Sequence, residues 1–276
     1  MKRFIFFLIL IFQGFGAFSQ SVLTGVVVDA GDNKPVPYVS IGITSKPNGT
    51  VSNIVGVFSL TLDNTVNNND TLKFSSIGYH DKVFLIGELK DKLKAGQLTI
   101  TLTKSVNELK QVSIIAKKAK VKIVGYETSS KLLSVGFASN NLGSQGGIII
   151  PIRHPETNLE NLSFLVVQNS FKHLAFRMNL YEMVNDKPGN NILTENIIIS
   201  IDDMQTGKIT YDLSKYNLYL NKDVLMTLEW IEAQPANNGH CAVATSLFGH
   251  TYFRQASQSP WVKKATGLGI SVKTSY

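Results

Sequence analysis

The sequence predicts an all-β protein built from two consecutive β-sandwiches. Apolar and polar residues alternate with a period of two in many segments of about five to eight residues, which is typical of half-buried strands. Clusters of Gly, Asn and Asp separate these segments at short intervals, as turns do. No helical pattern longer than a few turns is evident in the 276 residues. This length favours two domains, at about 150 residues for each.

The first half of the chain contains short strand patterns separated by turn residues. Asn48-Gly49 favours a tight turn, because both residues tolerate a positive φ. One helical turn is expected at 90–94. We expect a small antiparallel sandwich whose strands include Val22–Val28, Val36–Thr44, Gly56–Leu62, Leu72–Ile77 and Leu98–Leu102.

Several segments of this half occur in a familiar order. They are Gly25-Val-Val-Val-Asp29, Pro35-Val-Pro-Tyr-Val-Ser-Ile41, Gly49-Thr50, Asn53, Gly56-Val-Phe58 and Phe74-Ser-Ser-Ile-Gly-Tyr79. The order resembles the carboxypeptidase-regulatory-like domain, which is found at the N-terminus of TonB-dependent outer-membrane receptors and beside metallocarboxypeptidases. The resemblance implies a transthyretin-like (prealbumin-like) sandwich whose motif residues have structural rather than catalytic roles.

The rest of the chain does not fit either of those larger proteins. The segment 107–116 resembles the short strand that leads into a receptor plug, but too few residues follow for a plug and a large barrel. A zinc carboxypeptidase needs an HxxE pair, and His154-Pro155-Glu156 has the wrong spacing. The sequence also lacks GxSxG and SxxK motifs. We therefore expect no catalytic residue, no cofactor and no enzymatic activity.

The second half predicts longer strands with the same alternation. Leu174–Tyr181 alternates cleanly over its whole length, and Ser246–Arg254 reads as another strand. About eight strands with irregular loops suggest a jelly-roll-like double sheet. The whole arrangement resembles uncharacterised carboxypeptidase-like regulatory-domain proteins of Gram-negative cell envelopes, and this resemblance implies no known activity for the second half.

The N-terminus predicts export. Lys2 and Arg3 precede an apolar run and then small residues that end at Ser19, which is the pattern of a signal peptide. After its removal no segment is apolar for long enough to span a bilayer. We therefore expect a protein of the periplasm, the outer-membrane surface or the medium, with no nucleic-acid partner despite the formal charge of +7.

Four segments are predicted. They are a signal peptide at 1–19, a carboxypeptidase-regulatory-like domain at 20–104, a linker strand and basic stretch at 105–133, and a β-sandwich at 134–276. The basic run of Lys117, Lys118, Lys120 and Lys122 is interpreted as a solvated linker rather than an anion site.

A binding or scaffolding role is the first functional hypothesis, with a carbohydrate, a peptide or an envelope protein as partner. Aromatic and hydrogen-bonding side chains alternate on two strands of the second domain, where they either form a site or cover a solvent-facing sheet. The candidate ligand-binding residues are Arg177, Asn179, Tyr181, His250, Tyr252 and Arg254. We expect residues 134–276 to hold the ligand and the first domain to act as a spacer or dock.

One alternative function stays open, and two further clusters of polar residues are considered as cation or metal sites. An envelope-polymer hydrolase would need an acid/base pair of carboxylates, from Glu182, Glu195, Asp202, Glu229 or Glu232. Asp202-Asp203 is interpreted as a turn or weak cation site, because no His lies near it in sequence. The trio of His240, Cys241 and His250 is read as structural rather than metal-binding, because no carboxylate lies near it.

Overall fold

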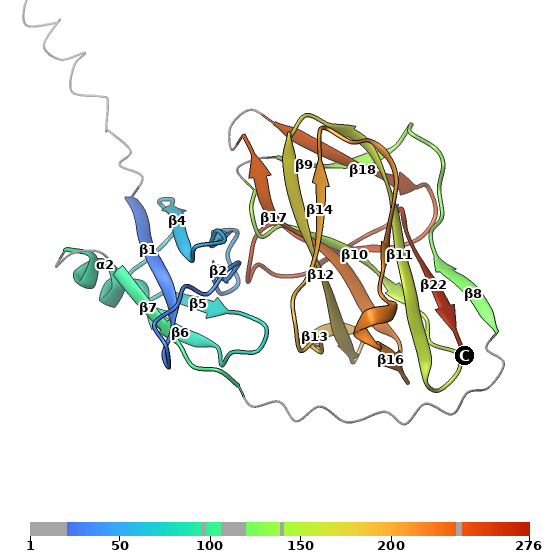
Figure 1. Ribbon diagram of the computed structural model, residues 1–276. Coiled ribbons are helices and arrows are strands. Elements are labelled where there is room, and N and C mark those ends of the chain that lie inside the picture. Colours follow the sequence, from blue (N-terminus) through green and yellow to red (C-terminus); the bar gives the residue numbers. More distant parts are fainter. Residues whose placement is uncertain (1–20, 95–97, 106–119, 139–140, 236–238) are drawn as a thin grey trace, which may run out of the picture.

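The computed structural model describes residues 21–94, 98–105, 120–138, 141–235 and 239–276, and these form two β-sandwiches (Figure 1). Some sequence predictions lie outside the described residues. They concern the signal peptide at 1–19, the strand at 107–116, and Lys117 and Lys118 of the basic run. Among the described residues, no helix is both long and apolar enough to cross a membrane.

The first sandwich consists of a three-stranded sheet in the order β4-β1-β7 and a four-stranded sheet in the order β3-β2-β5-β6. Its elements are β1 (Ser21–Asp29), β2 (Ser40–Ile43), β3 (Gly49–Val51), β4 (Val57–Leu62), β5 (Thr71–Ser75), β6 (Lys82–Leu85), α2 (Ile86–Lys94) and β7 (Leu98–Leu102). The predicted helical turn at 90–94 is the second half of α2. The all-β sandwich predicted from the sequence is confirmed.

One part of the sequence prediction for this sandwich is wrong. The strands were expected to be antiparallel throughout, but β1 and β7 pair in parallel, with Gly25 opposite Leu98 and Asp29 opposite Leu102. Alternation of apolar residues says which face a side chain takes, but it carries no information about strand direction. Direction is set by the long connection between β1 and β7, which contains the rest of the sandwich.

The second sandwich packs two larger sheets against each other. One runs β13-β12-β17-β10-β19-β20 with β14 also paired to β12, and the other runs β21-β18-β11-β22-β8 with β15 and β16 on β11 and β9 on β18. The strands are β8 (Val121–Gly125), β9 (Ser134–Ala138), β10 (Gln145–Ile150), β11 (Thr157–Asn169), β12 (His173–Val184), β13 (Lys187–Asn191), β14 (Ile197–Asp202), β15 (Gly207–Asp212), β16 (Tyr219–Leu220), β17 (Val224–Gln234), β18 (His240–Ser246), β19 (Thr251–Arg254), β20 (Val262–Lys264), β21 (Gly267–Leu268) and β22 (Ile270–Ser275), with a 3₁₀ turn at Ser214–Tyr216.

The double sheet agrees with the sequence, but two details differ. The segment expected as one strand, Ser246–Arg254, is broken, because β18 ends at Ser246 and β19 begins at Thr251. Gly249 between them has a φ of 120°, which a strand does not allow. In addition, β8 lies inside the segment predicted as a linker and pairs with β22.

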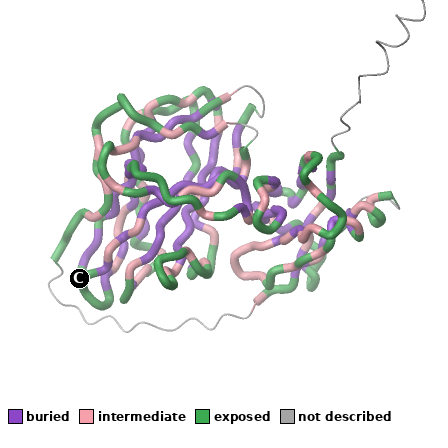
Figure 2. Tube along the Cα trace, turned by 180° about the vertical axis from the view of Figure 1, so that it is seen from behind, coloured by how far each residue is buried: buried purple, intermediate pink, exposed green. Residues whose placement is uncertain are grey.

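Each sandwich has its own apolar core (Figure 2). In the second core, the fully buried Trp230 ring stacks on Phe137 with ring centroids 5.6 Å apart and contacts Phe176 at 5.2 Å. Cys241 is buried in the same core, and burial raises the pKa of its thiol to about 12.

The four-stranded sheet of the first sandwich lies against the second sandwich. A small apolar cluster joins the two, formed by Tyr38, Val51, Ala175 and Ile231. The segment 256–259 also packs on the first sandwich: the Ser259 hydroxyl donates to the carbonyl of Lys46, between β2 and β3, at 3.0 Å, and the Gln258 amide donates to the hydroxyl of Ser75 on β5 at 2.9 Å. These contacts bring the two sandwiches together along one side of a cleft.

Candidate functional site

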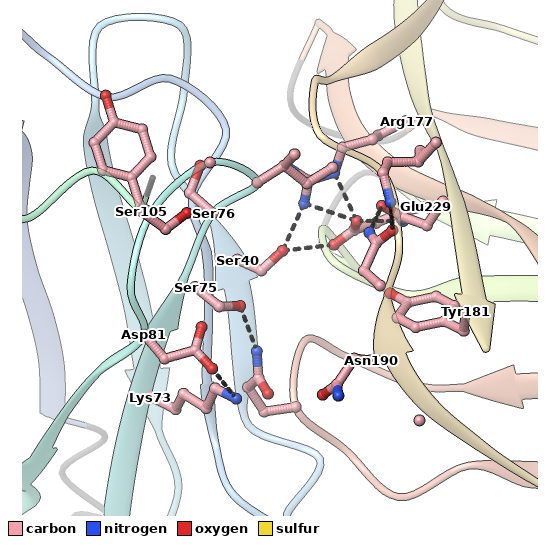
Figure 3. Close-up of a pocket in the computed structure, with 18 of the residues that line it drawn as sticks. Ser40, Lys73, Ser75, Ser76, Asp81, Ser105, Arg177, Tyr181, Asn190 and Glu229 are labelled. Atoms are coloured by element: carbon pink, nitrogen blue, oxygen red, sulfur yellow. Dashed lines mark hydrogen bonds and ion pairs between the residues drawn. The ribbon is translucent and has the colours of Figure 1, made fainter. Parts of the chain in front are cut away.

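A polar cleft of about 290 Å³ lies between the two sandwiches (Figure 3). The first sandwich contributes Ser40 from β2, Lys73 and Ser75 from β5, and the residues that follow β5. The second contributes side chains from β12, β13, β17 and β19. We call this space the interdomain cleft; its lining residues are Ser40, Lys73, Ser75, Ser76, Ile77, Gly78, Tyr79, Asp81, Ser105, Arg177, Asn179, Tyr181, Gly189, Asn190, Asn191, Leu193, Glu229, Arg254 and Gln258.

A buried ion pair lies at the inner end of the cleft. Arg177 on β12 and Glu229 on β17 are directly opposite each other in the antiparallel register. The Arg177 Nε and Nη2 atoms donate to Glu229 Oε2 at 2.9 and 2.7 Å, and the two side chains are 3% and 1% exposed. Asn179 Nδ2 donates to the same oxygen at 2.9 Å. A buried charge pair needs such additional hydrogen bonds to offset the loss of hydration.

The first sandwich completes this network. Arg177 Nη2 donates to the Ser40 hydroxyl at 2.6 Å, and Nη1 donates to the Tyr38 carbonyl at 2.6 Å. The Ser40 hydroxyl in turn donates to Glu229 Oε1 at 2.9 Å. Figure 3 shows these bonds crossing from the Ser40 wall to the Arg177 and Glu229 wall. One guanidinium group therefore binds a strand partner and the neighbouring domain at once.

Opposing effects act on the Glu229 carboxyl. Burial raises its pKa, but the positive charges of Arg177 and Arg254 and the hydrogen bonds from Asn179 and Arg177 outweigh burial and lower the pKa below its ordinary value. Glu229 is therefore ionised at neutral pH and does not supply a proton.

A second polar cluster lies beside the ion pair. The Tyr181 hydroxyl donates to Gln145 Oε1 at 3.0 Å and accepts a bond from Arg254 Nη2 at 3.0 Å. Burial raises the pKa of Tyr181. The buried Arg254 Nε, Gln145 Nε2 and Ser76 Oγ atoms have no hydrogen-bond partner among the described residues. Arg254 and Ser76 line the cleft, so two of these unsatisfied polar groups lie just behind its wall.

The structure brings together four of the six residues that the sequence singled out. Arg177, Asn179, Tyr181 and Arg254 all line the interdomain cleft. Arg177, Asn179 and Tyr181 are buried, so they do not form the outer surface of a solvent-facing sheet, which was the alternative expectation.

The other two candidates lie elsewhere. Tyr252 lines a neighbouring groove rather than the cleft. His250 is an exposed residue in the break between β18 and β19, where its backbone N–H donates to the Tyr126 hydroxyl at 3.3 Å. The strand predicted through Gly249 had placed His250 in line with Tyr252 and Arg254, and this placement is wrong.

The sequence analysis did not predict that residues of the first sandwich line the cleft. Ser40, Ser75 and Asp81 belong to a domain whose recognisable residues indicated only packing and turns. No local signal marks Ser40 or Ser75, because their partners lie far away in the chain: Ser40 and Arg177 are 137 positions apart, and Ser75 and Gln258 are 183 apart. The segment 185–191 reads as a loop in the sequence, because it is rich in Asn, Asp, Pro and Gly, but its second part is strand β13, which brings Asn190 to the cleft.

The carboxylates weighed for acid/base chemistry lie in different surroundings. Asp202 lies opposite His173 in the β12–β14 register, and Asp202 Oδ1 is 2.6 Å from His173 Nδ1. Glu232 Oε2 lies 3.9 Å from His173 Nε2 and accepts the Tyr38 hydroxyl at 2.7 Å. A histidine distant in sequence thus contacts Asp202. Glu182 Oε1 accepts the Asn190 backbone N–H at 3.3 Å.

The three residues considered as metal ligands differ in their exposure to solvent. Cys241 is buried in the core, whereas His240 and His250 are exposed. His240 Nε2 lies 3.3 Å from Gln168 Oε1. Among the described residues, no group of three or more His, Cys, Asp or Glu side chains is arranged to hold a metal ion.

Comparison with solved structures gives only distant similarities. The cysteine protease and lectin-like domains of Cwp84, a surface-layer-associated protein of Clostridium difficile, match with 13% identity and a TM-score of 0.41. That match covers 86% of this chain and 58% of the solved chain, so the chain spans less than two thirds of that protein. A structure of the infectious bursal disease virus Gx strain matches with 7% identity and a TM-score of 0.23, over 94% of this chain and 68% of the other. Neither similarity is close enough to carry an argument.

The family comparison is specific. No curated protein matches the chain. The family model described as the CarboxypepD_reg-like domain matches residues 23–114, which contain the first sandwich and the ordered segments identified from the sequence. The chain therefore carries a CarboxypepD_reg-like domain of transthyretin-like fold, and further β-sandwich structure follows it.

Proposed function

We propose that this protein is an exported, non-catalytic component of the cell envelope that binds a polar ligand in the interdomain cleft. The observation that carries the proposal is the convergence of Arg177, Asn179, Tyr181 and Arg254 on one cleft between the two sandwiches. Ligand sites usually combine a concave shape with a few polar groups that converge on it.

The lining favours a hydroxyl-rich or amide-rich ligand, such as a glycan or a peptide segment. Asn190 is exposed at the cleft and Ser75 is half-buried there, so an amide from the second sandwich and a hydroxyl from the first line the space. A volume of about 290 Å³ is at the lower end for small-molecule sites, which span ~300–1,000 Å³. An envelope protein would therefore insert a peptide segment rather than dock a broad face.

The experiment screens the mature chain, residues 20–276, on oligosaccharide and peptide arrays and measures each hit by calorimetry. Replacing Arg254 by Gln should weaken binding of a hit about 10-fold, because a hydrogen bond to a charged group contributes ~1.5–3 kcal/mol. Replacing Asn190 by Ala should weaken binding less, because a neutral hydrogen bond contributes ~0.5–1.5 kcal/mol. Phe248→Ala is the matched control, since Phe248 is 82% exposed and does not line the cleft. Hits that bind both cleft variants as tightly as the wild-type chain would refute a binding site in the cleft.

A hydrolase remains the second candidate, favoured by one observation. Asp202 and Glu232 both contact the His173 imidazole, so two carboxylates and a histidine meet near the domain interface. The test incubates each array hit with the chain and looks for cleavage products by mass spectrometry. Products that disappear in His173→Ala would favour the hydrolase, whereas an intact ligand supports a binding role.

A further inference from the structure

A larger groove lies next to the interdomain cleft. It has a volume of about 670 Å³. We call it the aromatic groove; its lining residues are Ile149, Asp186, Lys187, Pro188, Tyr252, Trp261 and Lys263. Trp261 is half-buried, so part of its indole is open to solvent, in contrast to Trp230 in the core.

Two features connect the groove to the cleft. Arg254 lines the cleft, and its guanidinium carbon lies 4.7 Å from the centre of the Trp261 ring. Pro188 lines the groove, while the next residue, Gly189, lines the cleft. The Tyr181 ring also meets the Trp261 ring edge-on at 5.4 Å. A ligand in the cleft that extends past Arg254 therefore reaches Trp261.

The charges along this path are mostly positive, and three of the five cations that line it have no ion-pair partner among the described residues. In the cleft, Lys73 is paired with Asp81 and Arg177 with Glu229. By contrast, no carboxylate among the described residues lies within ion-pair distance of Arg254, Lys187 or Lys263. Asp186 is the acidic residue of the groove. This surplus of cations favours a ligand that carries carboxylates.

The other lining groups favour a saccharide over a peptide. Sugar rings have apolar C–H faces that pack on exposed aromatic rings, and hydroxyls that need hydrogen-bonding side chains. Trp261 offers an aromatic ring, and Ser75 and Asn190 in the adjoining cleft offer hydrogen-bonding side chains. We propose that the cleft and the aromatic groove form one extended site for an acidic oligosaccharide, with a uronic acid unit bound by Arg254 and the next unit stacked on Trp261.

This proposal rests on the proposed binding function, and a length series separates the two. The probes are galacturonic acid and its dimer to hexamer, with neutral maltooligosaccharides of the same lengths as the charge control. We expect the affinity to rise about 10-fold from the monomer to the trimer as the groove becomes filled. The neutral series should bind more weakly at every length.

Tryptophan fluorescence gives an independent readout of the groove. The chain has two tryptophans, and Trp230 is fully buried. A ligand that stacks on Trp261 should shift the emission and protect Trp261 from acrylamide. Trp261→Phe should lose this signal but keep most of the affinity, since a ring remains. Trp261→Ala should weaken the trimer about 10-fold and the monomer less, because the monomer loses only the support that the ring gives to Arg254. Phe248→Ala is the control, and urea unfolding checks that both variants are folded.

Each remaining result contradicts a defined part of the proposal. If the monomer binds in an Arg254-dependent way but longer probes gain nothing, the cleft function stands and the extended site is wrong. If tetraglutamate shifts Trp261 emission and the uronates do not, the groove binds a peptide. If no uronate binds, the assignment to acidic saccharides fails.

Discussion

The Arg177 guanidinium group forms hydrogen bonds both within the second sandwich and across the domain interface. It donates to the Glu229 carboxylate on the neighbouring strand, to the Ser40 hydroxyl on β2 and to the Tyr38 carbonyl of the first sandwich. Because both side chains are almost completely buried, removal of one leaves the other charge poorly hydrated. The pair is therefore more sensitive to substitution than the exposed ion pairs among the described residues, such as Lys208–Glu127.

At this scale we predict that Arg177→Met destabilises the protein by about 3–5 kcal/mol, because it leaves the Glu229 carboxylate buried and unpaired. Urea unfolding at pH 7 measures the change. The double variant Arg177→Met/Glu229→Gln should recover part of the loss, since the charge is then absent.

The matched control is Lys208→Ala, which breaks the Lys208–Glu127 ion pair, whose side chains are more than half exposed. It should cost no more than about 1 kcal/mol. Equal losses for Arg177→Met and Lys208→Ala would contradict the importance of the buried pair.

At the scale of elements, the sequence predicted strands well where one face is buried. β7 was expected at Leu98–Leu102, the range found, and β4 was expected to begin one residue before Val57. Alternation was not sufficient in the region of Gly249, where a turn preserves the apolar pattern by chance. It also could not indicate that β8 pairs with β22, because that partner lies at the other end of the domain.

An element-scale prediction concerns the contact between β2 and the segment 256–259. A Cβ atom added at Gly42 would lie 1.9 Å from the Ser257 carbonyl oxygen, so the segment must move away. We expect Gly42→Ala to loosen the docking of the first sandwich and to increase the radius of gyration measured by X-ray scattering.

Gly136→Ala is the control for an added methyl group in a strand. Its Cβ would meet nothing closer than the Cys241 carbonyl at 3.9 Å. It should leave the scattering profile unchanged. An unchanged profile for Gly42→Ala as well would mean that this contact does not hold the domains together.

At the scale of the whole molecule, the sequence predicted two sandwiches but not how they combine. The first domain was expected to act as a spacer or dock, yet it supplies Ser40, Ser75 and Asp81 to the cleft wall. The four cleft residues taken from the second half were identifiable because Arg, Asn and Tyr are unusual on an alternating strand. Their partners were not, since a contact across two domains leaves no periodic pattern in the chain.

The interface includes an apolar cluster and the hydrogen bonds that the buried Arg177 guanidinium donates to Ser40 and to the Tyr38 carbonyl. Salt screens exposed charges strongly and buried pairs much less. We therefore predict that the scattering profile stays the same between 0.05 and 1 M NaCl, within about the precision of the measurement. A radius of gyration that grows with salt would indicate that surface charges hold the sandwiches together.

The single thiol of the chain has a practical consequence. Cys241 lies in the core between the sheets of the second sandwich, and its pKa is about 12. The reactive thiolate is therefore scarce and inaccessible while that core is closed. A maleimide dye should consequently label only molecules whose second sandwich has opened. The rate of labelling would therefore report how often the second sandwich opens. No engineered cysteine would be needed for this measurement.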